Sequence, residues 1–301
     1  MKGTVMTLRH MKIFEAVYRH SNITRAAGEL HLAQPSVSLA VRELEDYYGI
    51  RLFERIGRHI SPTDAGTEFY GYARHIVSLF DDMEKSVRNR DAFGTLRVGT
   101  SITIGTCILP RLIRLCTEAR PGLKIEAVVD TSSDIERHIL DNTVDLGLIE
   151  TSPESPDIVY EAFQKDSLCA IAPVRHPLTR ESSVSLSMLA EYPFLMREKG
   201  SAGRELLDAS FSLLQLTVRP VWESASTRAI VSAVSEGLGV AVLPESLVEK
   251  DIREGSVKKL PLDPPIHREL NIIYHKSKYL TPNLLFFLGL CRAYGQEPGS
   301  S

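Results

Sequence analysis

The sequence lacks any apolar run that could cross a bilayer, which needs about 20 residues. Residues 1–17 do not resemble a secretory signal, because Arg9, Lys12 and Glu15 interrupt the apolar positions. Only four cysteines occur among 301 residues, far below the density of a disulfide scaffold. We therefore expect a cytoplasmic protein with reduced thiols.

Motifs of common catalytic and metal sites are also missing. The sequence has no Gly-x-Ser-x-Gly, no phosphate-binding loop and no Gly-x-Gly-x-x-Gly. Its nine histidines are scattered, and no Cys-x-x-Cys pair occurs. We therefore expect no catalytic residues, no metal and no built-in cofactor.

The charge is divided unevenly along the chain. The totals are 35 Lys and Arg against 38 Asp and Glu, a formal net charge of −3, which argues against a nucleic-acid partner. Residues 1–63, however, hold nine basic and six acidic residues, a net of +3, and the remainder therefore carries −6. A small basic segment joined to a larger acidic one suggests that the first part binds a polyanion.

The basic segment shows three amphipathic helices. Apolar residues recur at helical spacing over 8–18 and 23–30, and a third helix is predicted from Pro35 to Gly49. The short connection before Pro35 indicates a helix-turn-helix. Ile50, Leu52 and Phe53 are expected to close a small core, and residues 55–60 to form a basic wing.

In such a unit the third helix lies in the major groove of DNA. Gln34 could pair with adenine, and the wing residues suit the DNA backbone or minor groove. The alternative is a solvated helix face followed by a polar turn. We predict that DNA contacts come from the outward face of this helix and from the wing: Gln34, Ser36, Ser38, Leu39, Arg42, Arg55, Arg58 and His59.

The stretch "ITRAAGELHLAQPSVSLAVRELEDYYGIRLFER", followed by "SPTDAG", resembles the DNA-binding domain of LysR-type transcriptional regulators. By this resemblance Gln34, Pro35, Ser38 and Arg55 take DNA-contacting positions. Two positions depart from the family pattern. Ala33 stands where a Ser or Thr often caps the helix, a cap worth about 1 kcal/mol. Leu39 replaces a basic or amide residue and could contact a thymine methyl group.

Residues 64–91 form a predicted long helix with a heptad stripe, which favours dimerisation. The alternative is one helix packed on its own domain. A two-fold dimer reads two half-sites of a dyad-symmetric promoter site, and the resemblance implies dimers or tetramers through this helix. The predicted stripe comprises Phe69, Ala73, Ile76, Phe80, Met83 and Val87.

After Gly94 short apolar runs alternate with helical stretches, as in α/β folds. The resemblance implies two Rossmann-like subdomains of type 2 periplasmic-binding-protein architecture, with hinges near 151–161 and 263–269. We expect strands at 96–100, 124–129, 145–149, 168–172, 193–196, 216–222, 240–243 and 270–274, and helices at 105–118, 133–141, 203–214, 227–236 and 283–294. The predicted domains are a winged helix-turn-helix (1–63), a linker helix (64–91) and an effector-binding domain (92–301), with subdomain I at 92–160 and 267–295 and subdomain II at 161–266.

Ligands of such sheets bind where strands end and helices begin. Hydroxyls and arginines at these points, with Arg228 nearby, suit a small anion. The alternative is that the hydroxyl groups only cap helices. The predicted effector-binding residues are Thr100, Ser101, Thr103, Thr151, Arg197, Ser201, Arg204 and Thr227.

Cys107 and Cys116 suggest a redox switch, because peroxide-sensing family members form a disulfide. Both fall in one predicted helix, however, about 13 Å apart, and a disulfide needs Cα atoms within about 7 Å. Buried apolar cysteines are therefore the better interpretation.

The leading hypothesis is a regulator that binds double-stranded DNA, acts on RNA polymerase and responds to a small anionic effector. The segment "GTSITIGTCILPRLI" resembles members that control carbon fixation or sulfur assimilation. The alternative is an α/β enzyme fused to a helical DNA-binding or dimerisation module.

Overall fold

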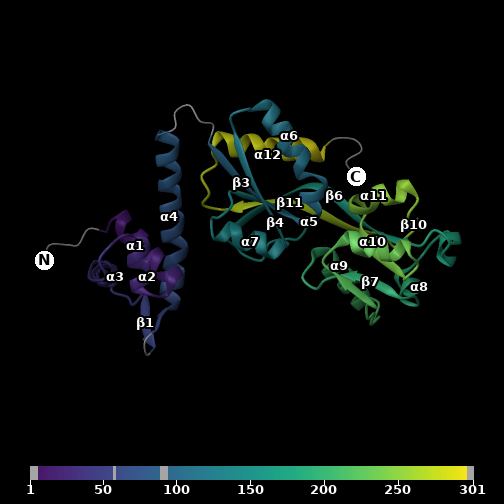
Figure 1. Ribbon diagram of the computed structural model, residues 1–301, viewed down its shortest axis with the longest axis horizontal. Coiled ribbons are helices and arrows are strands. Elements are labelled where there is room, and N and C mark those ends of the chain that lie inside the picture. Colours follow the sequence, from purple (N-terminus) through teal and green to yellow (C-terminus); the bar gives the residue numbers. More distant parts are fainter. Residues whose placement is uncertain (1–5, 57–58, 89–93, 297–301) are drawn as a thin grey trace. The chain divides into compact units, whose positions relative to one another are not determined.

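The structure is a computed structural model that describes residues 6–56, 59–88 and 94–296. The chain divides into two compact units at Gly94 (Figure 1). Each unit is described by itself below. Within the described residues no helix combines the length and the apolar character that a membrane span requires.

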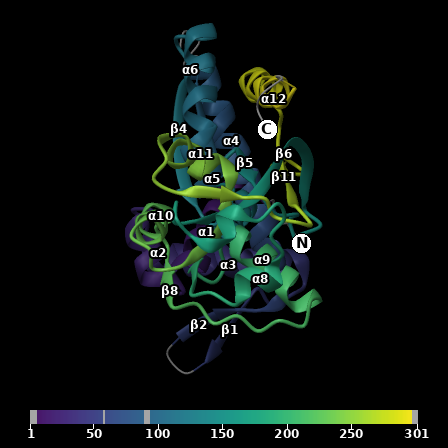
Figure 2. The ribbon, with the colours of Figure 1, turned by 90° about the vertical axis from the view of Figure 1, so that its right-hand side faces the viewer.

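The first unit is a winged helix-turn-helix followed by a long helix. Its elements are α1 (Leu8–His20), α2 (Ile23–Glu29), α3 (Gln34–Tyr48), β1 (Phe53–Ile56), β2 (His59–Pro62) and α4 (Asp64–Arg88). The antiparallel β1–β2 hairpin projects from the helices as the predicted wing (Figure 2). Four residues connect α2 to α3, as the helix-turn-helix pattern predicted.

The core of the first unit lies where α1 meets α3 and α4. Phe14 is fully buried and contacts the ring of Phe69 edge-on, with 4.8 Å between centroids. Leu52 and Phe53 join this core as predicted. Ile50 does not, because its side chain is 42% exposed.

The second unit is a nine-stranded sheet covered by helices. Its strand order is β4-β3-β5-β11-β6-β9-β7-β8, with β10 paired to β6. The strands are β3 (Thr95–Ser101), β4 (Lys124–Asp130), β5 (Leu146–Ile149), β6 (Ile158–Ala172), β7 (Phe194–Arg197), β8 (Trp222–Ser224), β9 (Val240–Pro244), β10 (Lys258–Leu260) and β11 (Ile266–His275). The helices are α5 (Ile102–Cys107), α6 (Leu109–Ala119), α7 (Ser132–Leu140), η1 (Pro177–Arg180), α8 (Leu186–Ala190), α9 (Ala202–Leu213), α10 (Thr227–Ser235), α11 (Glu245–Glu254) and α12 (Pro282–Gly295).

Two long strands join the halves of this unit. The chain leaves the first half along β6 and returns along β11, which pairs antiparallel with β6 from Ile266↔Leu168 to His275↔Ile158. The first half contains parallel strands β3, β4 and β5, and the second contains parallel strands β7, β8 and β9. The predicted α/β fold class is therefore confirmed. Parts of both expected hinges lie inside paired strands rather than in loops.

Several predicted elements were wrong in extent. The strands expected at 168–172 and 270–274 begin earlier, at Ile158 and Ile266. The helix expected at 105–118 is two helices, α5 and α6, because the backbone breaks at Ile108 and Pro110 starts the second helix. The strand expected at 216–222 is reduced to β8. Pro220 has no N–H group to donate to a neighbouring strand, which shortens the pairing.

The start of α4 gives a matched test of packing. A Cβ atom at Gly66 would collide with the carbonyl oxygen of Leu52, whereas one at Gly71 meets nothing within 4 Å. We expect Gly66→Ala to lower the free energy of unfolding by about 1–3 kcal/mol. Gly71→Ala should raise it by about 0.5–1 kcal/mol, because alanine is the better helix former. Thermal unfolding followed by circular dichroism measures both. Equal stability of the two variants would contradict the packing at Gly66.

Candidate functional site

The outward face of α3 forms the candidate DNA-contacting surface. Gln34, Pro35, Ser36 and Arg42 are exposed and Ser38 is half-buried. Leu39 is 54% exposed, although it is apolar. The opposite face, from Val37 to Leu44, packs on the core. The helix therefore presents all six predicted positions on or beside its open face.

Glu45 links this helix to the wing. It lies on the buried side of α3, and its Oε1 accepts the backbone N–H groups of Leu52 and Phe53 at 2.9 and 3.1 Å. Arg51 donates to the other oxygen at 3.1 Å. The glutamate thus positions the start of the hairpin relative to α3. This role of Glu45 was not predicted from the sequence.

Three predicted DNA contacts fall in the wing. Arg55 and His59 pair in the β1–β2 hairpin with Ile60 and Ile56. Their side chains, and the whole of Arg58, lie outside the described residues. The roles of these three residues therefore stay predictions from the sequence.

The apolar positions of α4 divide into two stripes. Phe69 and Ala73 pack into the core formed with α1, and Lys12 lies 5.7 Å from the ring centre of Phe80. The single predicted seam was therefore wrong, since it combines residues from both stripes. The side chain of Val87 lies outside the described residues. The exposed stripe, each member of which is 44–66% exposed, comprises Tyr72, Ile76, Leu79 and Met83.

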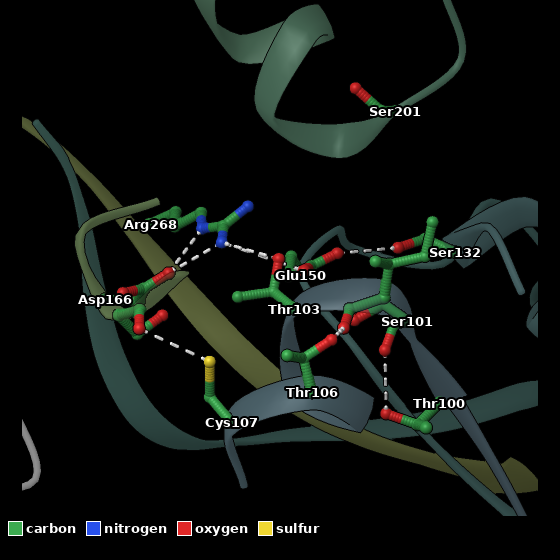
Figure 3. A network of polar contacts seen from close by, with 12 residues as sticks. Thr100, Ser101, Thr103, Thr106, Cys107, Ser132, Glu150, Asp166, Ser201 and Arg268 are labelled. Carbon is green, nitrogen blue, oxygen red and sulfur yellow. Dashed lines mark hydrogen bonds and ion pairs between the residues drawn. The ribbon is translucent and has the colours of Figure 1, made fainter. Parts of the chain in front are cut away.

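A pocket lies between the two halves of the α/β unit. Its walls come from the ends of β3, β4, β5, β7 and β9, the start of α9, and the crossing strand β11. Arg268 of β11 is one of its lining residues, and its polar contacts are shown in Figure 3. The polar residues that line it are Ser101, Thr103, Asp130, Thr131, Ser132, Glu150, Arg197, Glu198, Ser201, Arg204 and Arg268.

Arg268 is a buried cation whose side chain is only 5% exposed. Its Nε donates to Asp166 at 2.7 Å, and its Nη2 lies 2.7 Å from the same carboxylate and 3.7 Å from Glu150. Nη2 also donates to Thr103 at 3.4 Å. The remaining nitrogen, Nη1, points away from Asp166 toward the wall that carries Ser201 (Figure 3). One edge of the guanidinium is therefore held by the protein, and the other faces the pocket.

Ser101 provides an unused polar group in the lining of the same pocket. Its side chain is buried, with 2% of the residue exposed, and its hydroxyl oxygen has no hydrogen-bond partner in the described part of the chain. Burying an unpaired hydroxyl costs about 1–3 kcal/mol. Such a group on a pocket wall is suited to contact a bound molecule.

The arginines of the opposite wall are also ion-paired. Arg197 donates to Glu198 at 2.8 and 2.9 Å and to Thr227 at 3.1 Å. Arg204 contacts Asp208 at 2.8 Å and Glu223 at 3.1 Å. Both guanidinium groups are almost fully buried, so their orientations are fixed by the protein.

The structure brings five of the eight predicted effector residues to this pocket: Ser101, Thr103, Arg197, Ser201 and Arg204. Thr100 is buried and donates to the carbonyl of Ser101. The backbone carbonyl of Thr151 accepts a hydrogen bond from the side chain of Asn271, and the hydroxyl of Thr227 accepts one from Arg197. Arg228 is largely exposed and pairs with Asp251. These last four residues do not line the pocket.

Arg268 and Glu150 were not among the residues predicted from the sequence. Arg268 stands in the charged run His-Arg-Glu. The alternation of Ile266, Arg268 and Leu270 on the buried face of β11 was the available signal. Glu150 directly follows β5, so the rule that ligands bind at strand ends could have identified it.

The four cysteines are free thiols. Burial raises the pKa of each thiol above its ordinary value, to about 12 for Cys169. Cys107 lies in α5 and Cys116 in α6, so the expectation of a single helix for both was wrong. Raised pKa values disfavour the reactive thiolate at neutral pH. Within the described residues no group of His, Cys, Asp and Glu side chains is arranged to hold a metal ion.

Two family models match the chain. The LysR substrate binding domain matches residues 89–296, and the bacterial regulatory helix-turn-helix protein of the lysR family matches residues 8–67. The RuBisCO operon transcriptional regulator of Allochromatium vinosum is 35% identical over 280 residues, which cover 92% of each chain.

Solved structures show the same architecture. The regulatory domain of CcmR from Synechocystis PCC6803, in complex with 2-PG, is 28% identical and has a TM-score of 0.64. The match covers 68% of this chain and 98% of that domain. Full-length OxyR from Pseudomonas aeruginosa has a TM-score of 0.72 over 99% of this chain and 97% of its own, at 21% identity, and shows likeness of fold alone.

The two buried serines of one pocket wall give a matched prediction. Ser101→Ala should leave the melting temperature of the ligand-free protein unchanged or raise it, because no protein hydrogen bond is lost. Ser132→Ala should lower stability by about 1 kcal/mol, because Ser132 donates to Glu150 at 3.2 Å. Thermal unfolding compares them directly. A larger loss for Ser101→Ala would contradict the unpaired state of its hydroxyl.

Proposed function

The chain belongs to the LysR family of bacterial transcriptional regulators, and from this premise we propose how it works. It binds a dyad-symmetric promoter site through α3 and the wing. It assembles as a dimer or tetramer through α4, and it changes transcription when a small anionic effector enters the pocket. This activity would be exerted in the cytoplasm through RNA polymerase.

The arrangement at Arg268 is the observation that carries the effector part of this proposal. A buried guanidinium directs one nitrogen into the pocket, and the free hydroxyl of Ser101 lies on the adjoining wall. Guanidinium and hydroxyl donors together suit a carboxylate or phosphate group. The CcmR domain in complex with 2-PG makes this compound a rational first probe.

A regulator needs two states that bind the effector with different affinity. Thr103 and Glu150 belong to the first half of the unit, Ser201 and Arg204 to the second, and Arg268 to a crossing strand. An effector that touches both walls would favour the arrangement in which the halves lie closest. We propose that this shift changes the spacing or bending of the bound DNA.

The exposed stripe of α4 is the proposed dimer seam. Tyr72, Ile76, Leu79 and Met83 follow one another at intervals of 4, 3 and 4 residues, as in a coiled coil. Burial of a completely exposed side chain of this size contributes about 1.5–3 kcal/mol, and these side chains are 44–66% exposed, so each has about half of that to gain. The stripe therefore supplies apolar surface for the pairing of two helices.

The first test concerns DNA recognition. Gln34→Ala should weaken binding to DNA selected from a random library by about tenfold or more, because each dimer loses two amide contacts to bases. Gel shifts at fixed salt measure the loss. Gln296→Ala, an exposed glutamine of the α/β unit, serves as the control and should bind normally. Undiminished binding by the Gln34 variant would remove this role of α3.

The second test concerns assembly. The double variant Ile76→Glu with Leu79→Glu should convert dimers into monomers, because four like charges would be buried at one seam. Sedimentation or light scattering reports the mass. Leu285→Glu changes a similarly exposed apolar residue on α12 and should keep the native mass. A dimer that survives the double substitution would place the seam elsewhere.

A further inference from the structure

We propose that the pocket selects ligands that carry a hydrogen-bond donor beside their anionic group, and that it discriminates against simple anions. The donor is a hydroxyl or an ammonium group. This inference rests on the proposed effector function and defines its ligand class.

Positive and negative side chains are balanced around the pocket. Three arginines line it, but so do three carboxylates, those of Asp130, Glu150 and Glu198. Each arginine is already paired with at least one carboxylate. A bare anion would therefore gain little from the net charge of the site, and it would be repelled by the carboxylates.

Glu150 accepts few hydrogen bonds. Its side chain is 5% exposed, yet among the described residues its side-chain contacts are one hydrogen bond from Ser132 at 3.2 Å and the longer approach of Arg268 at 3.7 Å. A carboxylate has about four acceptor positions, and a buried carboxylate is stable only when donors occupy them. A donor on the ligand supplies what the protein leaves unfilled.

Hydrogen-bond donors and an acceptor line the same pocket. Ser101, with its unpaired hydroxyl, and the inward nitrogen of Arg268 are donors for an anionic group. Glu150 lies within 3.7 Å of the same guanidinium, and it accepts only. The guanidinium donor and the carboxylate acceptor thus stand next to each other, and Ser101 lines the same pocket. A ligand that matches both needs its anionic group and its donor on neighbouring atoms, as in a hydroxy acid, an amino acid or a hydroxylated phosphate ester.

A purely cationic ligand does not fit this arrangement. It would face the guanidinium groups of Arg197, Arg204 and Arg268 without an anionic group to contact them. A ligand that combines an anionic group with a hydrogen-bond donor can contact both the arginines and the carboxylates of the pocket.

The experiment compares probes that differ only in the donor. Propionate, L-lactate and L-alanine carry a hydrogen, a hydroxyl or an ammonium group beside the carboxylate. n-Propyl phosphate and glycerol 3-phosphate form a phosphate pair, and sulfate and inorganic phosphate are the simple anions. Binding to the full-length protein is measured by calorimetry and thermal shift at constant ionic strength.

We expect at least one donor-bearing probe to saturate at a concentration about tenfold or more below that of its partner without a donor. The hydroxyl and ammonium probes identify which donor is recognised. Sulfate and inorganic phosphate should not saturate in the same range.

Two variants assign this selectivity to residues. Glu150→Gln should reduce the preference to less than about threefold, because a neutral amide is a weaker acceptor than a carboxylate. Ser101→Ala should weaken both members of a pair equally, because it removes a contact to their common anionic group. Glu118→Gln, an exposed glutamate on α6, is the control and should preserve the preference. If Glu150→Gln does not fold, Asp130→Asn tests the other carboxylate of this wall.

The outcomes separate this inference from the proposed function. Equal binding of paired probes, or tighter binding of sulfate and phosphate, would overturn the donor requirement and leave an anion-responsive regulator. Failure of every anion to saturate, with DNA binding intact, would overturn both the ligand class and the effector function. A preference unchanged in Glu150→Gln and Asp130→Asn would also overturn the inference.

Discussion

A guanidinium can be buried only if carboxylates balance it, and Arg268 imposes this condition at the centre of the α/β unit. Arg268 stands directly opposite Asp166 in the pairing of β11 with β6. A slip of one residue would turn His267 or Glu269 toward the buried face instead. One charge therefore specifies the register of the two strands that join the halves, and it also provides the donor that faces the pocket.

The long helix α4 shows how one element can serve two surfaces. Phe69 and Ala73 fix the helix to α1 inside one chain, while Ile76 and Leu79 remain open on another face. Because the helix is rigid, the orientation of the recognition helix within a subunit is tied to the stripe that would meet a partner. A change in helix pairing would then move the DNA contacts as well.

The sequence was sufficient where a pattern repeats or a motif is local. The helix-turn-helix and the alternating strands and helices follow from apolar spacing, and five pocket residues were found at strand ends. It was insufficient where the partner is distant in sequence. Spacing alone could not assign Phe69 to the intramolecular core and Tyr72 to the open face, because both fit a helical stripe. Arg268 was not predicted because its partner Asp166 lies 102 positions away.

Net charge was the weakest guide to ligands, and the pocket explains why. The overall charge of −3 concealed the basic segment, and the acidic remainder contains three buried arginines at one pocket. These arginines are in turn neutralised by adjacent carboxylates. Electrostatic selection at such a site is decided within a few ångströms, where solvent does not screen the groups. The relevant quantity is therefore which donors and acceptors remain unfilled, because those groups, rather than the sum of charges, determine which small molecule replaces water there.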